Sequence, residues 1–212
     1  MRLRAKPVVK LNRGGKARMI DAFLTEALGR APEGLRVLDI GCGNGDICAH
    51  FARHNQAVGI DVADQCRAEY TDLVRCVGVS ESLPFRDGVF HVVISHHVIE
   101  HVQDHDLHMA EINRVLAPNG VCYLGTPNLS SPFMRGHVGN DMVLRYDQMR
   151  PLFQRHGFEV EEYYARWLHQ PDRYHCETRL FRLAPPTLLR GLRHWFPSQC
   201  FLLRPRVSAN DL

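Results

Sequence analysis

The segment RVLDIGCGNGD, from Arg36 to Asp46, constrains the fold of this chain more than any other feature. A short run of β-forming apolar residues ends in Gly41, Gly43 and Gly45, which stand at alternate positions. Glycine adopts positive φ angles easily and lets a ligand contact bare backbone. The pattern therefore predicts a buried strand, a tight turn against which a ligand lies, and a helix that begins at about Gly45.

Short β-rich runs alternate with helical patterns through the first 126 residues. Strands are expected over residues 35–40, 56–61, 72–78, 89–95 and 120–126, and helices over 15–30, 45–54, from about 63, and 104–116. This alternation is typical of a parallel sheet flanked by helices. The chain is expected to form an α/β domain of this kind.

The pattern changes after residue 126. A loop is expected from 127 to about 143, then a helix over 146–157, a strand over 158–164, a helix over 185–197 and a strand over 199–205. The two strands are expected to pair as an antiparallel hairpin at the edge of the sheet. The segment 185–197 combines Leu, Trp and Phe with basic residues, which fits either a core-docked helix or a membrane-surface site.

Composition narrows the class of protein. The formal net charge of +3 is too small to imply a nucleic-acid partner. Seven cysteines occur without any CxxC pair, so a reducing compartment is expected and neither a zinc site nor a disulfide framework is indicated. Because no stretch approaches the roughly 18 to 20 apolar residues that span a bilayer, a cytoplasmic protein is expected.

Two carboxylates indicate what lies against the glycine turn. A dinucleotide fingerprint would need glycine at position 46, where this chain has Asp46, and an acid at a helix start disfavours phosphate. Asp61 ends the second expected strand, where a carboxylate can accept both hydroxyls of a ribose. The sequence therefore predicts a nucleoside-like ligand without phosphate.

Five ordered segments carry a family resemblance: VLDIGCGNGD, GIDVA, SESLPFRDGVFHVVISHHVIEHV, EINRVLAPNGVCYLGTPN and HGFEV. Over roughly residues 35–164 the chain resembles the class I S-adenosylmethionine-dependent methyltransferases. The resemblance implies a Rossmann-like, seven-stranded, mostly parallel sheet with helices on both faces and an antiparallel terminal strand. Because 212 residues suffice for one sizeable domain and are too few for two ordinary ones, one methyltransferase domain is expected over residues 1–212. It would consist of an N-terminal arm and helix (1–34), a cofactor-binding core (35–126), and substrate-side loops with a terminal β-hairpin (127–212).

The resemblance implies a site for S-adenosylmethionine beyond the strand ends. Its expected residues are Asp39, Gly41, Cys42, Gly43, Asp61, Val62, Val79, Ser80, Glu81, Ser95 and His96. The residues that would border the methionine part of the cofactor are Asp39, Gly41 and Gly43. Asp61 would bind the ribose, and Ser95 and His96 would face the amino acid end of the cofactor.

Two positions depart from the family pattern. The aspartate that commonly holds the adenine amino group corresponds to Val79, so this contact would fall to the backbone, Ser80 or Glu81. The fourth strand has His91 where the family commonly has aspartate, and the role of that position stays open. These departures would permit a non-catalytic cofactor-binding module that serves a partner enzyme.

The segment SHHVIEHV contains the candidate catalytic residues His97, Glu100 and His101. If the segment is helical, all three lie on one face. Imidazole groups titrate near neutral pH and suit a general base. Three interpretations remain open: structural packing, a base role for His97 or His101, and divalent metal binding together with His137, as in metal-dependent enzymes that methylate the 3′-terminal ribose of small RNAs.

The expected function is methyl transfer from S-adenosylmethionine to a small organic acceptor by in-line attack. Oxygen is the favoured acceptor atom, with nitrogen or carbon as alternatives. A metal-assisted RNA ribose 2′-O-methyltransferase is the alternative enzyme, although the charge balance does not favour nucleic acid. The sequence leaves the acceptor and the oligomeric state open.

Overall fold

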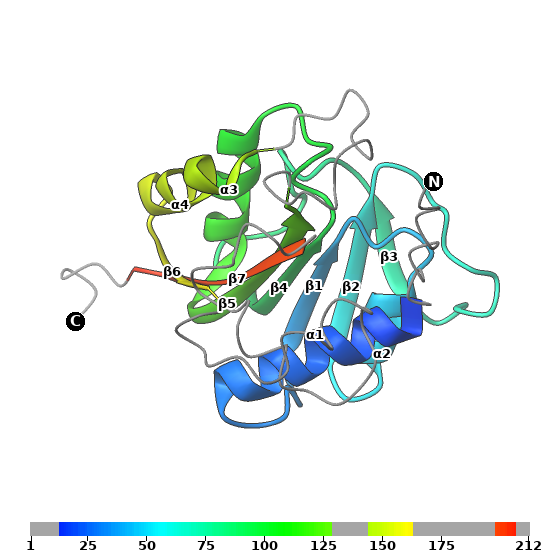
Figure 1. The fold of residues 1–212 in the computed structure, drawn as a ribbon. Helices are drawn as coiled ribbons and strands as arrows, with labels where there is room; N and C mark the ends of the chain where they lie inside the picture. Colours follow the sequence, from blue (N-terminus) through cyan, green and yellow to red (C-terminus); the bar gives the residue numbers. More distant parts are fainter. Residues whose placement is uncertain (1–12, 129–143, 163–197, 207–212) are drawn as a thin grey trace, which may run out of the picture.

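A computed structural model describes residues 13–128, 144–162 and 198–206. Within these ranges, seven strands form one sheet in the order β3-β2-β1-β4-β5-β7-β6 (Figure 1). The strands are β1 (Arg36–Ile40), β2 (Gln56–Asp61), β3 (Val74–Val77), β4 (Phe90–His96), β5 (Leu116–Pro127), β6 (Phe158–Glu162) and β7 (Ser198–Pro205). The helices are α1 (Arg13–Leu28), α2 (Asp46–Ala52), α3 (His105–Val115) and α4 (Tyr146–Arg155).

The sheet is mostly parallel, as the sequence predicts. Strand β1 pairs with β2 on one side and with β4 on the other, both in parallel. Strand β7 runs antiparallel between β5 and β6, which confirms the expected terminal hairpin and the antiparallel insertion. Because the chain moves outward in opposite directions from β1 and β4, the carboxyl ends of these two strands form the crevice where such sheets bind ligands.

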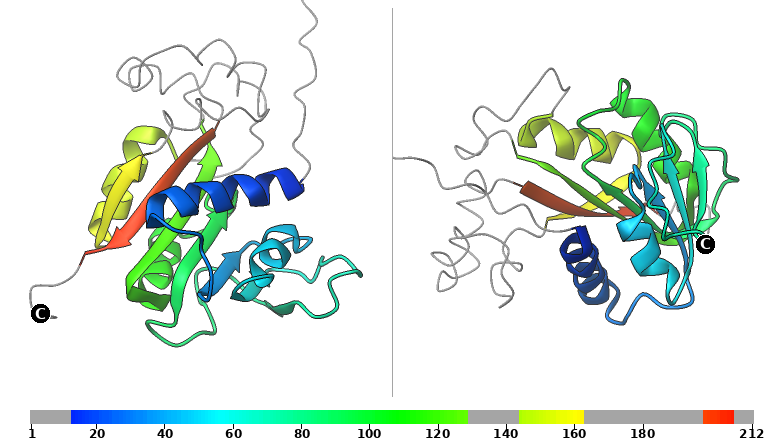
Figure 2. Two further views of the ribbon diagram at one scale, coloured as in Figure 1. Left: turned by 90° about the horizontal axis from the view of Figure 1, so that it is seen from below. Right: turned by 90° about the vertical axis from the view of Figure 1, so that its right-hand side faces the viewer.

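Helices cover both faces of the sheet (Figure 2). Val37, Val92 and Tyr123 pack with residues of α1 and α2 on one face. Their neighbours Leu38 and Val93 pack with residues of α3 and α4 on the other face. Since successive side chains of a strand point to opposite faces, a sheet covered on both sides needs continuous apolar runs. Burial on both faces therefore explains why the strands could be predicted from their apolar runs.

The predicted helix from about residue 63 is wrong. Residues 62–73 form turns and irregular structure instead. The side chain of Asp64 accepts a hydrogen bond from the backbone N–H of Cys66 at 3.3 Å, and the N–H of Arg67 donates to the carbonyl of Asn44 at 3.2 Å. Backbone groups that a helix would use are thus satisfied elsewhere.

Other sequence predictions differ in extent or cannot be compared. Strand β5 begins at Leu116, directly after α3, and its pairing with β4 contains an irregularity between Phe90 and Val92. The loop expected up to residue 143 and the helix expected over 185–197 lie largely or wholly outside the described residues. None of the helices that the structure describes combines the length and apolar character needed to cross a bilayer.

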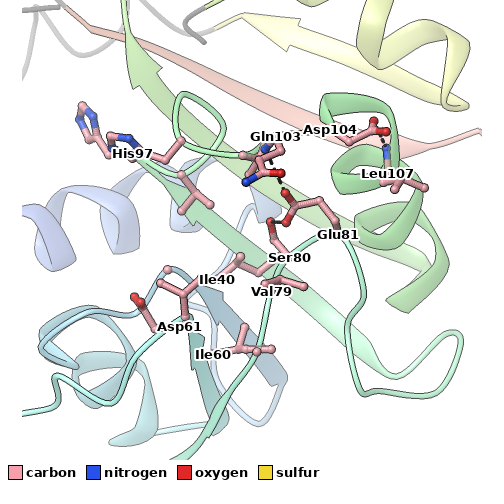
Figure 3. Close-up of a pocket in the computed structure, with 16 residues that line it drawn as sticks. Ile40, Ile60, Asp61, Val79, Ser80, Glu81, His97, Gln103, Asp104 and Leu107 are labelled. Carbon is pink, nitrogen blue, oxygen red and sulfur yellow. Dashed lines mark hydrogen bonds between the residues drawn. The ribbon is translucent and has the colours of Figure 1, made fainter. Parts of the chain in front are cut away.

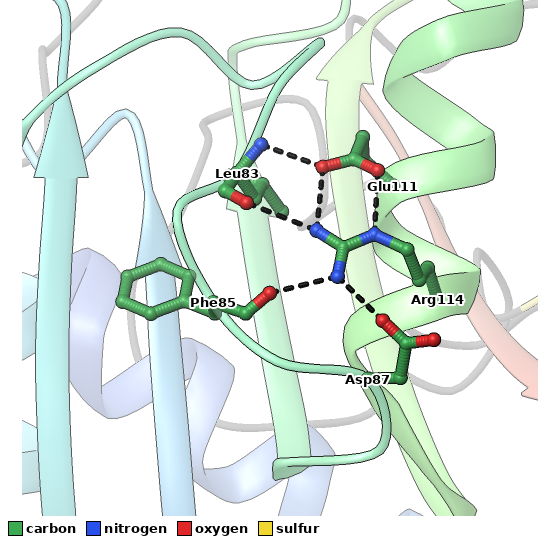
Figure 4. Close-up of polar contacts among 5 residues, drawn as sticks. All are labelled: Leu83, Phe85, Asp87, Glu111 and Arg114. Carbon is green, nitrogen blue, oxygen red and sulfur yellow. Dashed lines mark hydrogen bonds and ion pairs between the residues drawn. The ribbon is translucent and has the colours of Figure 1, made fainter.

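Arg114 of α3 holds the loop that follows β3 (Figure 4). Its guanidinium donates to the carbonyl oxygens of Leu83 and Phe85 at 2.9 and 2.7 Å. It also pairs with Asp87 and Glu111, both at 2.7 Å. Two carbonyls and two carboxylates accept hydrogen bonds from the planar guanidinium of Arg114. The single ammonium nitrogen of a lysine could not reach all four of them. The contacts fix the loop against α3.

Candidate cofactor and catalytic site

A cavity of about 640 Å³ opens at the carboxyl ends of β1, β2 and β4 (Figure 3). Its walls come from the ends of β1 and β2, the loop after β3, and the turns between β4 and α3. Eight residues predicted from the sequence line it: Gly41, Asp61, Val62, Val79, Ser80, Glu81, His97 and His101. The fold thus gathers much of the predicted site around one space.

The turn after β1 requires glycine. Gly41, Gly43 and Gly45 have φ angles of 68°, 51° and 85°, which disfavour side chains. A Cβ atom at Gly41 would overlap the side chain of Val98, and one at Gly45 would lie 2.7 Å from Cys66 Sγ. The bare turn therefore brings the backbone to the cavity wall.

Asp61 connects the end of β2 to this turn. Its Oδ2 atom accepts a hydrogen bond from the backbone N–H of Gly43 at 2.8 Å. Asp46 lies at the start of α2, where Oδ1 accepts from the Tyr70 hydroxyl at 2.9 Å and Oδ2 accepts from the Asn44 amide at 3.1 Å. The negative charge of Asp46 opposes phosphate binding at this helix start.

Three other predicted residues, in the turn or at the end of β1, do not line the main cavity. Cys42 and Gly43 line a smaller cavity of about 120 Å³ that also includes Asp61. Asp39 is buried below the turn, and its Oδ2 atom has no hydrogen-bond partner among the described residues. Burial raises the pKa of Asp39 to about 8, against the effect of a hydrogen bond from the Cys48 backbone. The hydrogen bond from Cys48 thus joins Asp39 of β1 to α2.

Ser95 and His96 point to opposite faces of β4, and neither lines the main cavity. The Ser95 hydroxyl lies 3.4 Å from Nε2 of His108, whose pKa burial lowers to about 4. His96 Nδ1 lies 3.4 Å from the hydroxyl of Tyr123, and burial lowers the pKa of His96. Both residues therefore form contacts at the end of β4 itself.

The candidate catalytic residues lie in a turn, not in a helix, so the shared helical face is absent. His97 has a positive φ of 60°, and its Nδ1 atom lies 2.8 Å from Oε1 of Glu100. Glu100 is only 3% exposed, and its Oε2 atom accepts a hydrogen bond from Thr126 Oγ1 at 3.1 Å. The turn places His97 and His101 on the cavity wall and Glu100 in the interior.

Sequence reasoning missed Thr126. It stands near the end of β5, and β5 pairs with β4. A polar residue at the carboxyl end of a neighbouring strand was the available signal.

No group of three or more His, Cys, Asp or Glu side chains in the described ranges is arranged to hold a metal ion. His137, the fourth residue of the metal interpretation, lies outside those ranges.

His91 forms a hydrogen bond that joins two strands. His91 Nδ1 accepts a hydrogen bond from the backbone N–H of Arg36 at 3.0 Å. This contact joins the amino-terminal ends of β4 and β1, opposite to the end that forms the cavity. Burial, together with the nearby charge of Arg36, lowers the pKa of His91. The departure from the family pattern therefore lies away from the cavity.

The lining of the cavity fits a purine nucleoside. Val62, Val79 and Leu107 line it, although they are 69%, 48% and 51% exposed in the structure. Large apolar side chains at such exposure offer contact to a flat apolar ring. Asp61 and Glu81 supply carboxylates on the same lining. The residues present thus suit the adenosine part of S-adenosylmethionine.

Comparisons with known proteins agree with this geometry. A family model described as a methyltransferase domain matches residues 38–124. A ubiquinone biosynthesis O-methyltransferase of Mesorhizobium japonicum is 33% identical over 125 residues, which are 54% of this chain and 50% of that protein. The chain therefore spans about half the length of the curated relatives it matches.

Solved structures share the fold at low sequence identity. A TehB-like S-adenosylmethionine-dependent methyltransferase of Corynebacterium glutamicum superposes with a TM-score of 0.61 and 18% identity, over 91% of this chain and 88% of that one. The [4+2]-cyclase SpnF superposes with a TM-score of 0.63 and 19% identity, over 96% and 85%. The fold is thus shared by proteins of different activity. Residues 38–124 thus match a methyltransferase domain, and the described residues share the fold of an S-adenosylmethionine-dependent methyltransferase.

Proposed function

We propose that this protein transfers a methyl group from S-adenosylmethionine to a hydroxyl group of a small organic molecule. One observation carries the proposal. His97, which forms a hydrogen bond with the buried carboxylate of Glu100, lines the same cavity as Gly41 and Asp61. The matched region of the relatives belongs to O-methyltransferases, which favours oxygen as the acceptor atom.

The cofactor would lie across the ends of β1, β2 and β3. Asp61 would bind the ribose, because its carboxylate lies beside the glycine turn and lines the cavity. Gly41, Val62, Val79, Ser80 and Glu81 would contact the rest of the cofactor from the same lining. Asp39, Cys42 and Gly43 would shape the turn, while Ser95 and His96 would hold the end of β4.

His97 would act as the general base. S-adenosylmethionine supplies an electrophilic methyl group when it is bound. Nε2 of His97 would accept the proton that the acceptor hydroxyl releases when its oxygen takes the methyl group, the sulfur–methyl bond breaks and S-adenosylhomocysteine leaves. Glu100 would accept a hydrogen bond from Nδ1–H, which keeps Nε2 free for that proton and fixes the imidazole orientation. Thr126 would hold Glu100 in place.

A methyl-transfer assay tests the proposal. The purified protein is incubated with radiolabelled S-adenosylmethionine and a panel of catechols and other phenols, with an RNA oligonucleotide in a parallel reaction. We expect label in a small hydroxylated acceptor and not in RNA. His97→Ala is expected to lower turnover on that acceptor by roughly 100-fold or more, the scale of general base catalysis. Labelled RNA, or an unchanged rate in His97→Ala, would contradict the proposal.

A further inference from the structure

Cysteine side chains gather at a second, smaller cavity beside the glycine turn. This cavity has a volume of about 120 Å³. Three cysteines within the described residues line it: Cys42 from the turn after β1, Cys66 from the segment between β2 and β3, and Cys76 from β3. Asp61 lines both this cavity and the main one. The two cavities therefore share the carboxylate at which the proposed function places the ribose.

Two of these thiols are packed against the backbone of β2. Cys42 is 9% exposed, and a Cβ atom at Gly59 would lie 2.8 Å from its sulfur. Burial raises the pKa of Cys42 to about 12. The thiol of Cys76 donates to the carbonyl oxygen of Gly59 at 3.9 Å, and burial raises its pKa as well. Both groups therefore stay protonated near neutral pH, and a protonated thiol is a poor nucleophile because the thiolate is the reactive form.

Cys66 is the more accessible thiol of the three-cysteine cavity. It is half-buried and lies in a segment without regular structure. A Cβ atom at Gly45 would lie 2.7 Å from its sulfur, so the sulfur lies beside the glycine turn. The backbone N–H of Cys66 donates to Asp64 Oδ1 at 3.3 Å, and the same carboxylate pairs with Arg75 at 2.9 Å. These contacts hold Cys66 at the edge of the small cavity.

The small cavity has room for a group attached to Cys66. Its volume of about 120 Å³ suits a group of a few heavy atoms, since one water molecule takes up about 30 Å³ in the liquid. Gly43 and Asp61 line the same cavity and are joined by a hydrogen bond of 2.8 Å. A group on Cys66 would therefore lie beside the Asp61 carboxylate and take space that the ribose needs.

We propose that Cys66 is a site of reversible thiolation by small disulfides, and that the attached group excludes the cofactor from Asp61. This inference rests on the proposed function, because it assumes that the ribose of the cofactor lies at Asp61. The three-cysteine cavity then links methyl transfer to the thiol–disulfide balance around the protein.

The reaction is a thiol–disulfide exchange. The Cys66 thiolate attacks one sulfur of the small disulfide, so a new S–S bond forms at Cys66 and the S–S bond of the disulfide breaks. The departing thiolate takes up the proton that the Cys66 thiol lost. The Cys66 sulfur is oxidised and the departing sulfur is reduced. A dithiol reductant reverses the exchange.

Titration calorimetry with S-adenosylhomocysteine tests the inference without any methyl acceptor. Affinity is measured on the untreated protein, after reaction with 2-hydroxyethyl disulfide, and after reduction by dithiothreitol. Peptide mapping by mass spectrometry identifies the cysteines that carry the hydroxyethylthio group. We expect the treated protein to bind at least about tenfold more weakly, the scale of overfilling a packed site, and reduction to restore the affinity.

The outcomes separate this inference from the proposed function. If the untreated protein does not bind S-adenosylhomocysteine, both are overturned. If the untreated protein binds, but Cys66 stays unmodified or the modified protein binds equally well, only the inference is overturned.

Two variants of nearly equal size locate the effect, each compared before and after treatment. Cys66→Ser removes the reacting sulfur, so treatment is expected to leave its affinity for S-adenosylhomocysteine unchanged. Cys76→Ser is the matched control, because it removes another thiol of the same cavity, and its affinity is expected to fall on treatment as that of the wild type does. A fall in treated Cys66→Ser, or none in treated Cys76→Ser, would assign the effect to another cysteine and overturn the inference.

Protection by the ligand distinguishes competition from damage to the fold. At about 100 times its Kd, S-adenosylhomocysteine leaves only about 1% of the protein unliganded, so thiolation of Cys66 is expected to slow at least about tenfold. Cys200 of β7 is half-buried and lines neither cavity, so its rate of thiolation is expected to stay the same. Equal rates at Cys66 with and without the ligand would overturn the inference.

Discussion

The Nδ1 atom of His97 lies 2.8 Å from Oε1 of Glu100, a carboxylate that is almost wholly buried. The opposite oxygen of the same carboxylate accepts a hydrogen bond from Thr126. His97 also has a φ angle of 60°, a conformation that costs free energy in a non-glycine residue and is found preferentially at functional sites. The hydrogen bonds from Thr126 to Glu100 and between Glu100 and His97 thus link β5 to the cavity wall.

Glu100→Gln tests whether the carboxylate orients the base. The amide can present an N–H to His97 Nδ1 and favour the tautomer that protonates Nε2, which would block proton acceptance. We expect kcat to fall roughly 10- to 1000-fold with little change in KM. Steady-state kinetics on the acceptor found in the methyl-transfer assay provide the measurement. Glu159→Gln, at an exposed position of β6, serves as control, and a kcat within twofold of wild type in Glu100→Gln would refute this role.

Substitutions of Thr126 test whether its hydrogen bond to Glu100 contributes to catalysis. Thr126→Val keeps the volume of the side chain but leaves Glu100 Oε2 without the hydroxyl, whereas Thr126→Ser keeps the hydroxyl. We expect Thr126→Val to lower kcat by roughly tenfold and to displace the pH profile of kcat, and Thr126→Ser to restore both. If the two variants share one pH profile, Thr126 has only a packing role.

The fold was largely predictable from the sequence because both sheet faces are buried. Neighbouring residues such as Val37 and Leu38 pack on opposite faces, which makes strands read as apolar runs. The helix predicted from about residue 63 was wrong because the structure of this segment depends on hydrogen bonds to residues that are distant in the sequence. The Arg67 N–H donates to the carbonyl of Asn44, which no local pattern reveals.

The candidate site was predictable where position alone fixes the role. Gly41 directly follows β1 and Asp61 is the last residue of β2, and the sheet brings both to one cavity. Hydrogen bonds between residues that are distant in the sequence were not predictable. Thr126 donates to Glu100, 26 residues away, and the N–H of Arg36 donates to His91, 55 residues away. Predicting either hydrogen bond requires knowledge of which strands are neighbours in the sheet.

Asp39 makes stability depend on pH. Its pKa is raised from 3.8 to about 8 in the folded protein, chiefly by burial. Between these values the folded state holds a proton that the unfolded state releases, so the stabilisation is full below about pH 4 and is lost as the pH rises to about 8.

Asp39→Asn removes this dependence because asparagine does not ionise. Urea unfolding at pH 5 and pH 8 is expected to show that the wild type loses roughly 2 to 4 kcal/mol more than the variant between the two pH values. Parallel losses in the two proteins would show that Asp39 ionises in the folded state as freely as in the unfolded chain.

Arg114 stabilises the loop that forms one wall of the cavity. Arg114→Lys keeps the charge but loses the fork that reaches Leu83, Phe85, Asp87 and Glu111 together. We expect the free energy of unfolding to fall by roughly 1 to 3 kcal/mol, measured by urea denaturation. Arg86→Lys, an exposed neighbour in the same loop, is the control. Equal stability of Arg114→Lys and wild type would show that the loop does not depend on these contacts.

We expect the nucleoside of S-adenosylmethionine to bind in the cavity at the ends of β1 and β2, with Asp61 on the ribose. Calorimetric titration with S-adenosylhomocysteine tests it most directly, in wild type, Asp61→Ala and the exposed control Asp72→Ala. We predict micromolar binding to the wild type and the control, and at least about tenfold weaker binding to Asp61→Ala. Absence of binding to the wild type, or equal affinity in Asp61→Ala, would show that the nucleoside does not bind in this cavity through Asp61.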